Sequence, residues 1–430
     1  MTAPAKYLFV TMEGGGNLPP VAGAARRLLA RGHDVRILGE PCMRSAIEQC
    51  GARFVPFTRH FVRQSRSEEI FYDWQASSPP AALKGTLQRV VLGPAAHVVA
   101  DVGAVLDQEP ADALVIDWLL PGAIMMGEAR RIPTAVLFHC ISMLPAPGRP
   151  AGPFAPARGP LGRLRDRLMG AMLVRLAGSF GAEFNRVRRS LGLGPLTNPL
   201  EQYQRADRCL YLTSDAFDFP ATSDAPNATY VGPVLDDPDW AGGGWESPFH
   251  RDDARPLVLL SLSSTFQNQR ALLQTAIDAL GRLDVRALVT LGPAMAAETF
   301  RSADNVRLVP SAPHAAVLPH ARAFVTHCGH GSIMRALAAG VPVVALPMGR
   351  DQDANATRLV VRGAGIRPRK SAAAIAGAVS RVLQDGSYRV AATSLGERVL
   401  EDVRRDRLSE ELLGLVRSAP ARRFASSAGG

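Results

Sequence analysis

The sequence predicts an α/β protein with two parallel-sheet domains, and three observations lead to this prediction. The chain has 430 residues, more than one compact core usually organises. Short apolar runs alternate with helix-compatible stretches in two separate series. Between these series, residues 232–256 are rich in glycine, proline and acidic side chains and show no periodicity, as is typical of a linker.

The first series begins with an apolar run at 7–11, three glycines from Gly14 to Gly16, and a stretch with helical periodicity at 18–30. The other strand-like runs of this series lie at 34–38, 54–57, 113–116 and 134–139. In 58–100 and 141–180 the alternation loosens, and aromatic residues, prolines and glycines accumulate. We expect these two segments to be excursions from the sheet.

The second series starts directly after the linker. Its strand-like runs lie at 257–262, 286–291, 306–309, 323–326 and 341–346. A helix-compatible segment at 394–417 follows, and the small, polar residues 418–430 are expected to form a flexible tail. The predicted organisation is an N-terminal domain at 1–231, the linker 232–256, a C-terminal domain at 257–393, the helix 394–417 packing back towards the N-terminal domain, and the tail.

The composition narrows the functional classes. Hydrophobic residues make up 47% and charged residues 20%, as in a globular protein. The net charge is +10, but the arginines are scattered and aromatic residues make up only 6%, so we expect no nucleic-acid partner. The five cysteines are scattered, without the spacing of a zinc site. We expect reduced thiols, no membrane span and a cytoplasmic location.

The densest motif, THCGHGSIMRALAAGVPVVALPMGRDQDANA, runs from Thr326 to Ala356. It begins where a predicted strand ends, and Gly329 and Gly331 allow a turn in which the backbone can approach a ligand closely. Ser332 is the expected N-cap of the helix that follows. A helix N-terminus after a glycine-rich turn is a ready-made anion site, because free N–H groups and the helix dipole both favour negative charge.

Two histidines flank this turn, His327 and His330, and both can donate hydrogen bonds to an anion. By itself, a glycine turn before a helix usually serves only to pack a strand against a helix. The histidines, together with Asp351 and Gln352 further along the motif, favour a ligand site over that alternative.

The motif resembles the signature of the nucleotide-sugar glycosyltransferases that include plant secondary-product enzymes, glucuronosyltransferases and bacterial macrolide enzymes. Their signature combines a His-Cys-Gly turn, a Gly-Val-Pro strand and an Asp-Gln pair followed by Asn-Ala, which is Asn355-Ala356 here. The match covers 313–356 without gaps. Weaker matches lie at 14–33, 113–133 and 257–269.

The resemblance implies a GT-B fold, with two Rossmann-like parallel-sheet domains facing each other across a cleft. The N-terminal domain would bind the acceptor and the C-terminal domain the nucleotide sugar. The implied reaction is inverting transfer of a hexose or deoxyhexose from a UDP- or dTDP-sugar to a small apolar or aromatic natural product, with no other cofactor.

The resemblance also implies roles in donor binding. Asp351 and Gln352 would bind hydroxyl groups of the donor sugar. The residues implied at the diphosphate are Ser263, Ser264, His327, Gly329, His330, Gly331 and Ser332. Hydroxyl and backbone N–H groups suit that task.

The nucleoside site, expected around Ser311, Ala312, His314 and Arg335, departs from the family pattern. The aromatic residue that stacks on uracil in the plant enzymes falls at Ser311, and Arg335 replaces the glutamate that binds the ribose. One explanation is a donor without a 2′-hydroxyl, such as a dTDP-sugar, and another is a different set of contacts to UDP. A third is that Arg335 is a solvated helix arginine.

The catalytic base is the largest departure. The histidine that serves as base in most of these enzymes falls at Asn17, and asparagine cannot accept a proton at neutral pH. Asp117 occupies the position of the family's aspartate and is our expected base, with Asn17 orienting the acceptor. Alternatively, Asp117 only caps a helix or turn. His139, at the end of the next strand, is the other candidate base.

The acceptor pocket is expected to be lined by Phe61, Phe71, Tyr72, Trp74 and Met143, from the two excursions. Such side chains can equally belong to an ordinary core. No metal is expected, since no Asp-x-Asp motif precedes the sugar site. Two other functions stay open, a catalytically silent partner protein and a nucleotide-sugar epimerase. The expected partners are the small-molecule donor and acceptor, and the expected state is a monomer or homodimer.

Overall fold

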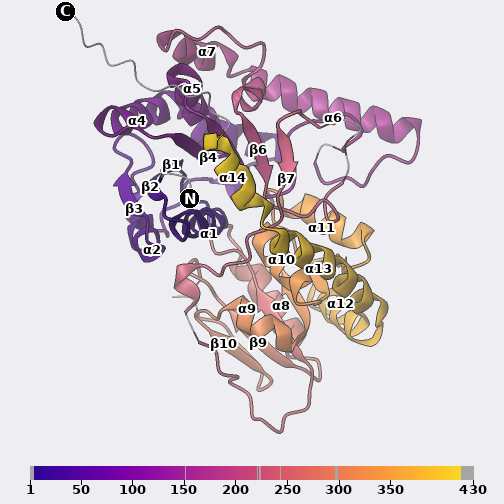
Figure 1. Cartoon of the computed structure of the whole chain (residues 1–430). Helices are drawn as coiled ribbons and strands as arrows, with labels where there is room; N and C mark the ends of the chain where they lie inside the picture. Colours follow the sequence, from indigo (N-terminus) through magenta and orange to yellow (C-terminus); the bar gives the residue numbers. More distant parts are fainter. Residues whose placement is uncertain are drawn as a thin grey trace, which may run out of the picture.

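The computed structural model describes residues 4–150, 152–219, 221, 224–242, 244–295 and 299–417, so the expected tail 418–430 lies outside the described residues. Two parallel sheets form the centres of two α/β bodies (Figure 1). This is the predicted fold class. Parallel neighbouring strands need crossover connections, which are usually helices, and the alternation of apolar runs with helical stretches along the chain supplies them.

The N-terminal sheet has seven strands in the order β3-β2-β1-β4-β5-β6-β7. The strands are β1 (Lys6–Val10), β2 (Asp34–Gly39), β3 (Arg53–Pro56), β4 (Ala113–Asp117), β5 (Thr134–Phe138), β6 (Arg208–Tyr211) and β7 (Ala228–Tyr230). Val10 pairs with Leu38 on one side and with Ile116 on the other. The strand order therefore reverses at β1, and ligand sites of such sheets lie beyond the carboxyl ends of the strands at this point.

The C-terminal sheet has six strands in the order β10-β9-β8-β11-β12-β13. The strands are β8 (Leu257–Ser261), β9 (Arg286–Thr290), β10 (Val306–Val309), β11 (Ala321–Thr326), β12 (Val343–Ala345) and β13 (Gly365–Ile366). Its reversal point lies between β8 and β11, which pair from Leu257 to Ser261. The carboxyl ends of these two strands lead into the segments around Ser263 and His327.

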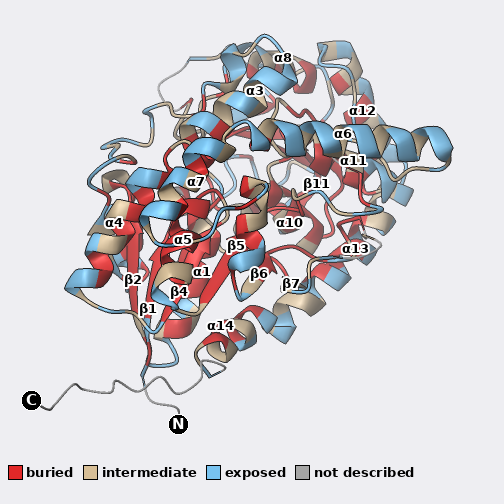
Figure 2. Cartoon of the chain, turned by 90° about the horizontal axis from the view of Figure 1, so that it is seen from above, coloured by how far each residue is buried: buried red, intermediate tan, exposed pale blue. Residues whose placement is uncertain are grey.

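Helices cover the sheets. They are α1 (Leu18–Leu29), α2 (Arg44–Gln49), α3 (Pro79–Thr86), α4 (Ala95–Gln108), α5 (Pro121–Arg130), α6 (Pro160–Gly178), α7 (Gly181–Ser190), α8 (Arg270–Leu280), α9 (His314–Val317), α10 (His330–Ala338), α11 (Gln352–Val361), α12 (Ala372–Gln384), α13 (Ser387–Arg405) and α14 (Arg407–Arg417). Buried residues concentrate in the strands and on the inner faces of the helices (Figure 2).

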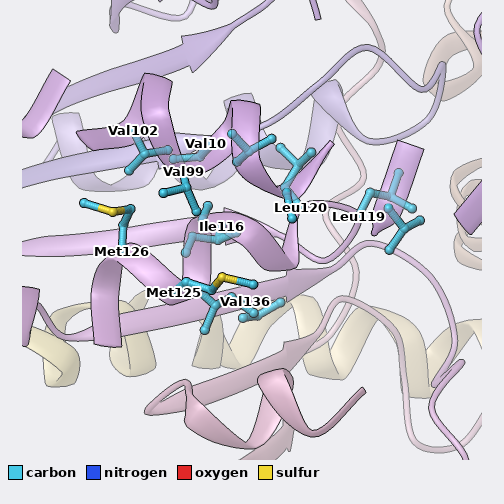
Figure 3. Packing of buried hydrophobic residues seen from close by; sticks show 14 of the residues in the cluster. Val10, Val99, Val102, Ile116, Leu119, Leu120, Met125, Met126 and Val136 are labelled. Atoms are coloured by element: carbon cyan, nitrogen blue, oxygen red, sulfur yellow. The ribbon is translucent and has the colours of Figure 1, made fainter. Parts of the chain in front are cut away.

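The central strand β1 shows why both faces of its sheet are covered. Leu8 and Val10 point into one apolar cluster, whereas Tyr7 and Phe9 point into another on the opposite face. Side chains of a strand alternate between the two faces, so a strand that is apolar from residue 7 to residue 10 needs cover on both sides. In the first cluster, Val10 and Ile116 of the sheet pack with residues of α4 and α5 (Figure 3).

One helical stretch, Pro79–Gln108, is long and apolar enough to cross a membrane by length and composition. From the sequence, no membrane span is expected. The most apolar window of this stretch is 56% buried inside the protein, and α4 packs on α5. Val98 and Val102 belong to the core cluster beside β4. This burial is what a core helix of a globular domain shows.

The C-terminal segment differs from the single helix expected at 394–417. Instead, α13 begins at Ser387 and ends at Arg405, Asp406 has a left-handed backbone with φ of 46°, and α14 follows. The break redirects the chain onto the N-terminal domain, where Leu412 lies in a core cluster with Phe9. Tyr7 donates a hydrogen bond from its hydroxyl to the Leu412 carbonyl at 3.1 Å.

Candidate active site

The carboxyl ends of strands from both sheets meet where the two domains touch. From the N-terminal sheet come the glycine loop after β1, Asp117 at the end of β4 and His139 directly after β5. From the C-terminal sheet come the segments after β8 and β11. Ser264 donates a hydrogen bond from its hydroxyl to the Gly15 carbonyl at 3.3 Å, which joins the two sides directly.

Asp117 lies at the centre of a buried polar cluster. Its Oδ2 accepts hydrogen bonds from Asn17 Nδ2 at 2.6 Å and from the Thr11 hydroxyl at 2.9 Å, and its Oδ1 accepts one from the Leu119 backbone at 3.0 Å. The Asp117 side chain has no exposed surface. Both oxygens of its carboxylate therefore accept hydrogen bonds, and the group is fully buried.

Asn17 bridges Asp117 to the glycine loop. Its Oδ1 accepts a hydrogen bond from the Gly14 backbone at 2.8 Å, while its Nδ2 is shared between Asp117 and the Met12 carbonyl. Both ends of the amide are engaged, and the residue is 1% exposed. In this arrangement Asn17 fixes the loop and the carboxylate rather than presenting a free group to an acceptor.

His139 is the titratable neighbour of Asp117. Its Nδ1 lies 3.7 Å from Asp117 Oδ1 and is buried without a hydrogen-bond partner, while 12% of the side chain stays exposed. The charge of His139 also acts on His330 of the other domain. A histidine whose buried nitrogen faces a carboxylate and whose ring is partly exposed has the geometry of a general base that is oriented by that carboxylate.

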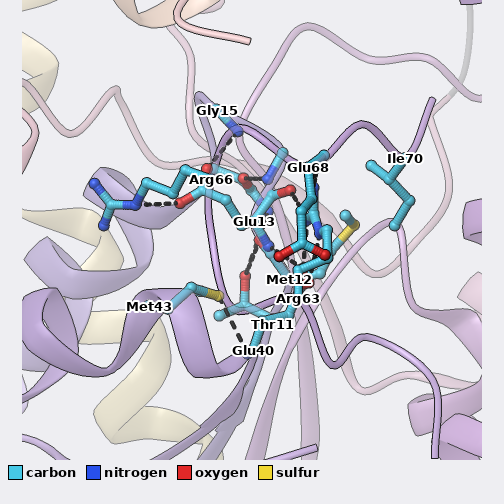
Figure 4. A network of polar contacts seen from close by, with 12 residues as sticks. Thr11, Met12, Glu13, Gly15, Glu40, Met43, Arg63, Arg66, Glu68 and Ile70 are labelled. Atoms are coloured by element: carbon cyan, nitrogen blue, oxygen red, sulfur yellow. Dashed lines mark hydrogen bonds and ion pairs between the residues drawn. The ribbon is translucent and has the colours of Figure 1, made fainter. Parts of the chain in front are cut away.

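A second carboxylate network holds the glycine loop (Figure 4). Glu13 accepts a hydrogen bond from the Gly15 backbone at 2.7 Å and lies 3.2 Å from Arg66 Nε. The Glu13 backbone N–H in turn donates to Glu40 at 2.8 Å, and Glu40 is paired with Arg63 at 2.6 Å. Burial raises the pKa of Glu13, an effect that Arg66 opposes. No local motif indicates this network, because the partners in it come from separate segments of the chain.

The glycine-rich turn of the C-terminal domain comes directly before α10. Cys328 has a left-handed backbone with φ of 70°, and α10 starts at His330 with Gly329 as its N-cap. The prediction of Ser332 as the N-cap is therefore wrong, since Ser332 lies within the first turn of α10. A side chain at position 329 would place its Cβ 2.6 Å from His327 Nε2, so a larger residue there would displace the His327 ring.

Both histidines of the turn are held neutral at physiological pH. Burial, with Arg350 as the next cause, lowers the pKa of His327 to about 3. Burial also lowers the pKa of His330, against the opposing charge of Asp351. His330 donates from Nε2 to the Leu212 carbonyl of the N-terminal domain at 3.2 Å. His327, in contrast, interacts with the backbone of Ser261, at the end of β8.

The serines after β8 lie against the glycine loop of the N-terminal domain. A Cβ at Gly15, whose φ is 88°, would come within 2.6 Å of Thr265 Cγ2 and 3.0 Å of the Ser264 hydroxyl. The Ser263 hydroxyl is 3.1 Å from that of Thr265. Thr265 and Gly15 are thus part of this region, although no sequence motif gives either of them a role.

Asp351 and Gln352 lie at the start of α11. Asp351 accepts a hydrogen bond from Asn355 at 2.8 Å, which gives the Asn of the motif a structural role. Gln352 is buried and donates to Gln267 at 2.8 Å while its Oε1 accepts from the Met348 backbone. Gln267, from the segment after β8, is a further member of the site that no local motif indicated.

At the expected nucleoside end, Arg335 is not a solvated helix arginine. Its side chain is 11% exposed, it pairs with Asp237 at 3.1 Å, and it donates to the Leu235 carbonyl at 3.2 Å. Asp237 also accepts from the Ala315 backbone at 3.0 Å, next to His314. Arg335 therefore clamps the start of the linker onto the segment that contains Ser311, Ala312 and His314.

The expected acceptor-lining residues separate into two groups. Phe61 and Phe71 are buried in the core cluster of the N-terminal domain, at 2% and 6% exposure, which matches the alternative of an ordinary core. Tyr72 and Trp74 are exposed, and Trp74 lies edge-on to Phe266 of the C-terminal domain at 5.3 Å. Met143 is half-buried beside the C-terminal core.

Comparisons with known proteins agree with this architecture. A family model described as erythromycin biosynthesis protein CIII-like, C-terminal domain, matches residues 274–413. The chain is 30% identical over 404 residues to 4′-demethylrebeccamycin synthase of Lentzea aerocolonigenes, a match that covers 91% of this chain and 94% of the relative.

Two solved structures illustrate the likeness in fold. The glycotransferase of kitacinnamycin superposes with a TM-score of 0.76 at 22% identity and covers 96% of this chain and 100% of its own. Spinosyn rhamnosyltransferase SpnG complexed with thymidine diphosphate superposes with a TM-score of 0.67 at 18% identity, covering 95% and 100%.

Proposed function

The chain belongs to the nucleotide-sugar-dependent glycosyltransferases of the GT-B fold, and on this basis we propose that it transfers a hexose or deoxyhexose from a UDP- or dTDP-sugar to a small apolar or aromatic natural product, with inversion. The observation that carries the proposal is the Asp117–His139 pair at the edge of one sheet, opposite the glycine turn before α10. One side can accept a proton and the other can bind an anion.

We propose that His139 takes the proton of the acceptor and that Asp117 stabilises the imidazolium. The acceptor attacks C1 of the sugar, the bond from C1 to the diphosphate oxygen breaks, and the proton of the acceptor moves to Nε2 of His139. Asp117, expected from the sequence to be the base, has both carboxylate oxygens engaged. It could accept the proton itself only if Asn17 moved away, which makes it the second candidate.

On the donor side, the proposal assigns the diphosphate to His327, the serines after β8 and the backbone from Gly329 to Ser332. The N-terminus of α10 supplies free N–H groups there, in addition to the helix dipole. Asp351 and Gln352 are proposed to bind sugar hydroxyls, since Asp351 keeps an oxygen free of Asn355.

The identity of the donor base is proposed from Arg335. Arg335 stands at the position that holds a ribose-binding glutamate in the family, so this position offers no carboxylate. The carboxylate of Asp237 is paired with the Arg335 guanidinium and is not free either. We favour a dTDP-sugar, which lacks the 2′-hydroxyl. A relative in fold that binds thymidine diphosphate, SpnG, supports this choice.

A thermal-shift panel of UDP, dTDP and their glucose conjugates tests the donor assignment, because a ligand that binds only the folded state raises its apparent stability. At a concentration of about 100 times Kd, the stabilisation is about 2.7 kcal/mol. We expect dTDP compounds to shift the transition more than UDP compounds. No shift with any nucleotide would contradict the proposed donor class, and a preference for UDP would contradict only the choice of base.

A further inference from the structure

Arg350 lies in the loop between β12 and α11, directly before Asp351. Its backbone is left-handed, with φ of 57°, and it follows Gly349, whose φ is 155°. A non-glycine residue in the left-handed region costs energy unless the surroundings hold it, and such residues gather at functional sites. Neither the motif nor the proposed mechanism has yet given Arg350 a role.

The guanidinium of Arg350 is held by groups of both domains. It pairs with the two carboxylate oxygens of Asp73 at 3.0 and 3.1 Å, and it donates to the Thr265 hydroxyl at 2.7 Å. It also lies over the Phe71 ring, 4.1 Å from the centroid. The side chains of Arg350 and Asp73 are 19% and 9% exposed, so the pair is largely shielded from water.

These contacts place the charge beside the proposed diphosphate site. Thr265 is hydrogen-bonded to Ser263, and the charge of Arg350 is felt by His327. Arg350 therefore borders two of the three elements to which the diphosphate is assigned. The third, the N-terminus of α10, starts three residues after His327.

The diphosphate needs a cation at this place. As the sugar leaves, negative charge grows on the diphosphate, and a fixed positive group lowers the barrier to that step. His327 and His330 are neutral and supply no positive charge, and the N–H of His330 is already donated from Nε2 to the Leu212 carbonyl. Arg335 is committed to Asp237 at the nucleoside end.

We propose that Arg350 binds the diphosphate of the donor and stabilises it as the leaving group, and that Asp73 positions its guanidinium. The inference rests on the proposed function. When the bond between C1 and the diphosphate oxygen breaks, the electron pair stays on that oxygen and Arg350 offsets its charge, so the leaving group needs no proton. An arginine suits this task because its planar fork can share two phosphate oxygens while it stays charged.

Asp73 belongs to the N-terminal excursion, next to Trp74, which contacts Phe266 of the other domain. The same guanidinium would thus face the donor on one side and the acceptor-side segment on the other. Asp73 is paired with Arg350 and would compete with the diphosphate for its guanidinium. Removing that carboxylate should free the charge for the nucleotide but leave it poorly oriented.

Calorimetric binding of dTDP, UDP, TMP and UMP to the full-length protein tests this role. The monophosphates lack the second phosphate and serve as an internal control for folding. For R350Q we expect diphosphate affinity to fall about 10- to 100-fold, as for a lost hydrogen bond to a charged group, with monophosphate affinity within about threefold of wild type. R350K should lie between the two, and R130Q, which removes a surface arginine paired with Asp107, should bind like wild type.

D73N separates positioning from binding. It should keep or raise the affinity for diphosphates, whereas the rate of donor turnover should fall. The role of Arg350 is overturned if R350Q keeps the wild-type preference for diphosphate over monophosphate, or if it loses both to the same extent. Failure of the wild-type protein to bind any of the four nucleotides would instead refute the proposed function.

Discussion

The two halves of the site differ in how their residues are distributed along the chain. In the proposed donor half, His327, Gly329, Asp351 and Gln352 fall within one segment of the C-terminal domain, from β11 to α11. In the proposed acceptor half, Asn17, Asp117 and His139 come from three different strand ends and meet only through the parallel order of β1, β4 and β5. A local sequence motif can therefore reveal the contiguous residues of the first half. The residues of the second half are brought together only by the folded sheet.

This difference explains where sequence reasoning succeeded. The alternation of apolar runs predicted the two parallel sheets, because a parallel strand buried on both faces must be apolar along its length. Helix ends were harder to place: Asp406 breaks one expected helix into α13 and α14, and α10 begins at His330 rather than after Ser332. Both misjudgements concern single residues in the left-handed or cap conformation, which composition does not determine.

The site shows the same limit. The 326–356 motif predicted several candidate site residues, but not Arg350. The role proposed for Arg350, which lies inside the motif, depends on its contact with Asp73, 277 positions away. Thr265, Gln267 and Glu13 were missed for the same reason, since each acts through a partner distant in the chain. Aromatic residues near Phe61 could not be divided into core and pocket without knowing the layers above the sheet.

The largest expected effect addresses the acceptor half. H139A should lower kcat about 10²- to 10⁴-fold, the usual contribution of a general base. D117N should be similarly impaired, and the double variant should be little worse than either, because the two residues act as one unit. Rates would be measured by chromatography with a neutral phenol as test acceptor, and H97A, an exposed histidine on α4, is the control.

An acidic nitrophenol sharpens this comparison, since an acceptor that ionises easily needs less help from a base. The deficit of H139A should shrink with it. If Asp117 takes the proton directly, H139A would keep most of its activity while D117N would lose it. That pattern would return the role of base to the carboxylate.

The next effect concerns the contact between the halves. G15A should destabilise the contact between the two domains by about 1–3 kcal/mol, because a Cβ there meets Thr265 and the backbone is left-handed. We expect kcat/KM to fall accordingly. G32A is a matched control: its φ is 81°, but nothing lies within 4 Å of the added Cβ. Equal losses in the two variants would mean that backbone strain, not the domain contact, is responsible.

A smaller effect is expected from acid, and it belongs to the donor half. The pKa of His327 is lowered to about 3 in the folded protein, against about 6.5 in the unfolded chain. Below pH 6.5 the unfolded chain therefore binds a proton that the folded protein does not. The free energy of unfolding consequently decreases as the pH is lowered. At pH 5 the contribution of His327 to this decrease is about 2 kcal/mol. Urea unfolding at pH 7 and pH 5 should show it, and H327N should show a smaller difference between the two.

The smallest expected effect is that of a chelator. If the N-terminus of α10 and the Arg350 guanidinium together balance the charge of the diphosphate, no metal ion is needed for its departure. Turnover should then be unchanged in excess EDTA and after adding Mg²⁺. The comparison becomes sharper in R350Q, where Mg²⁺ could partly replace the lost charge and raise the rate. Loss of wild-type activity in EDTA, restored by Mg²⁺, would show that the α10 N-terminus and Arg350 are not enough to balance the charge of the diphosphate. The proposed donor half would then also depend on a metal ion for which the sequence contains no motif.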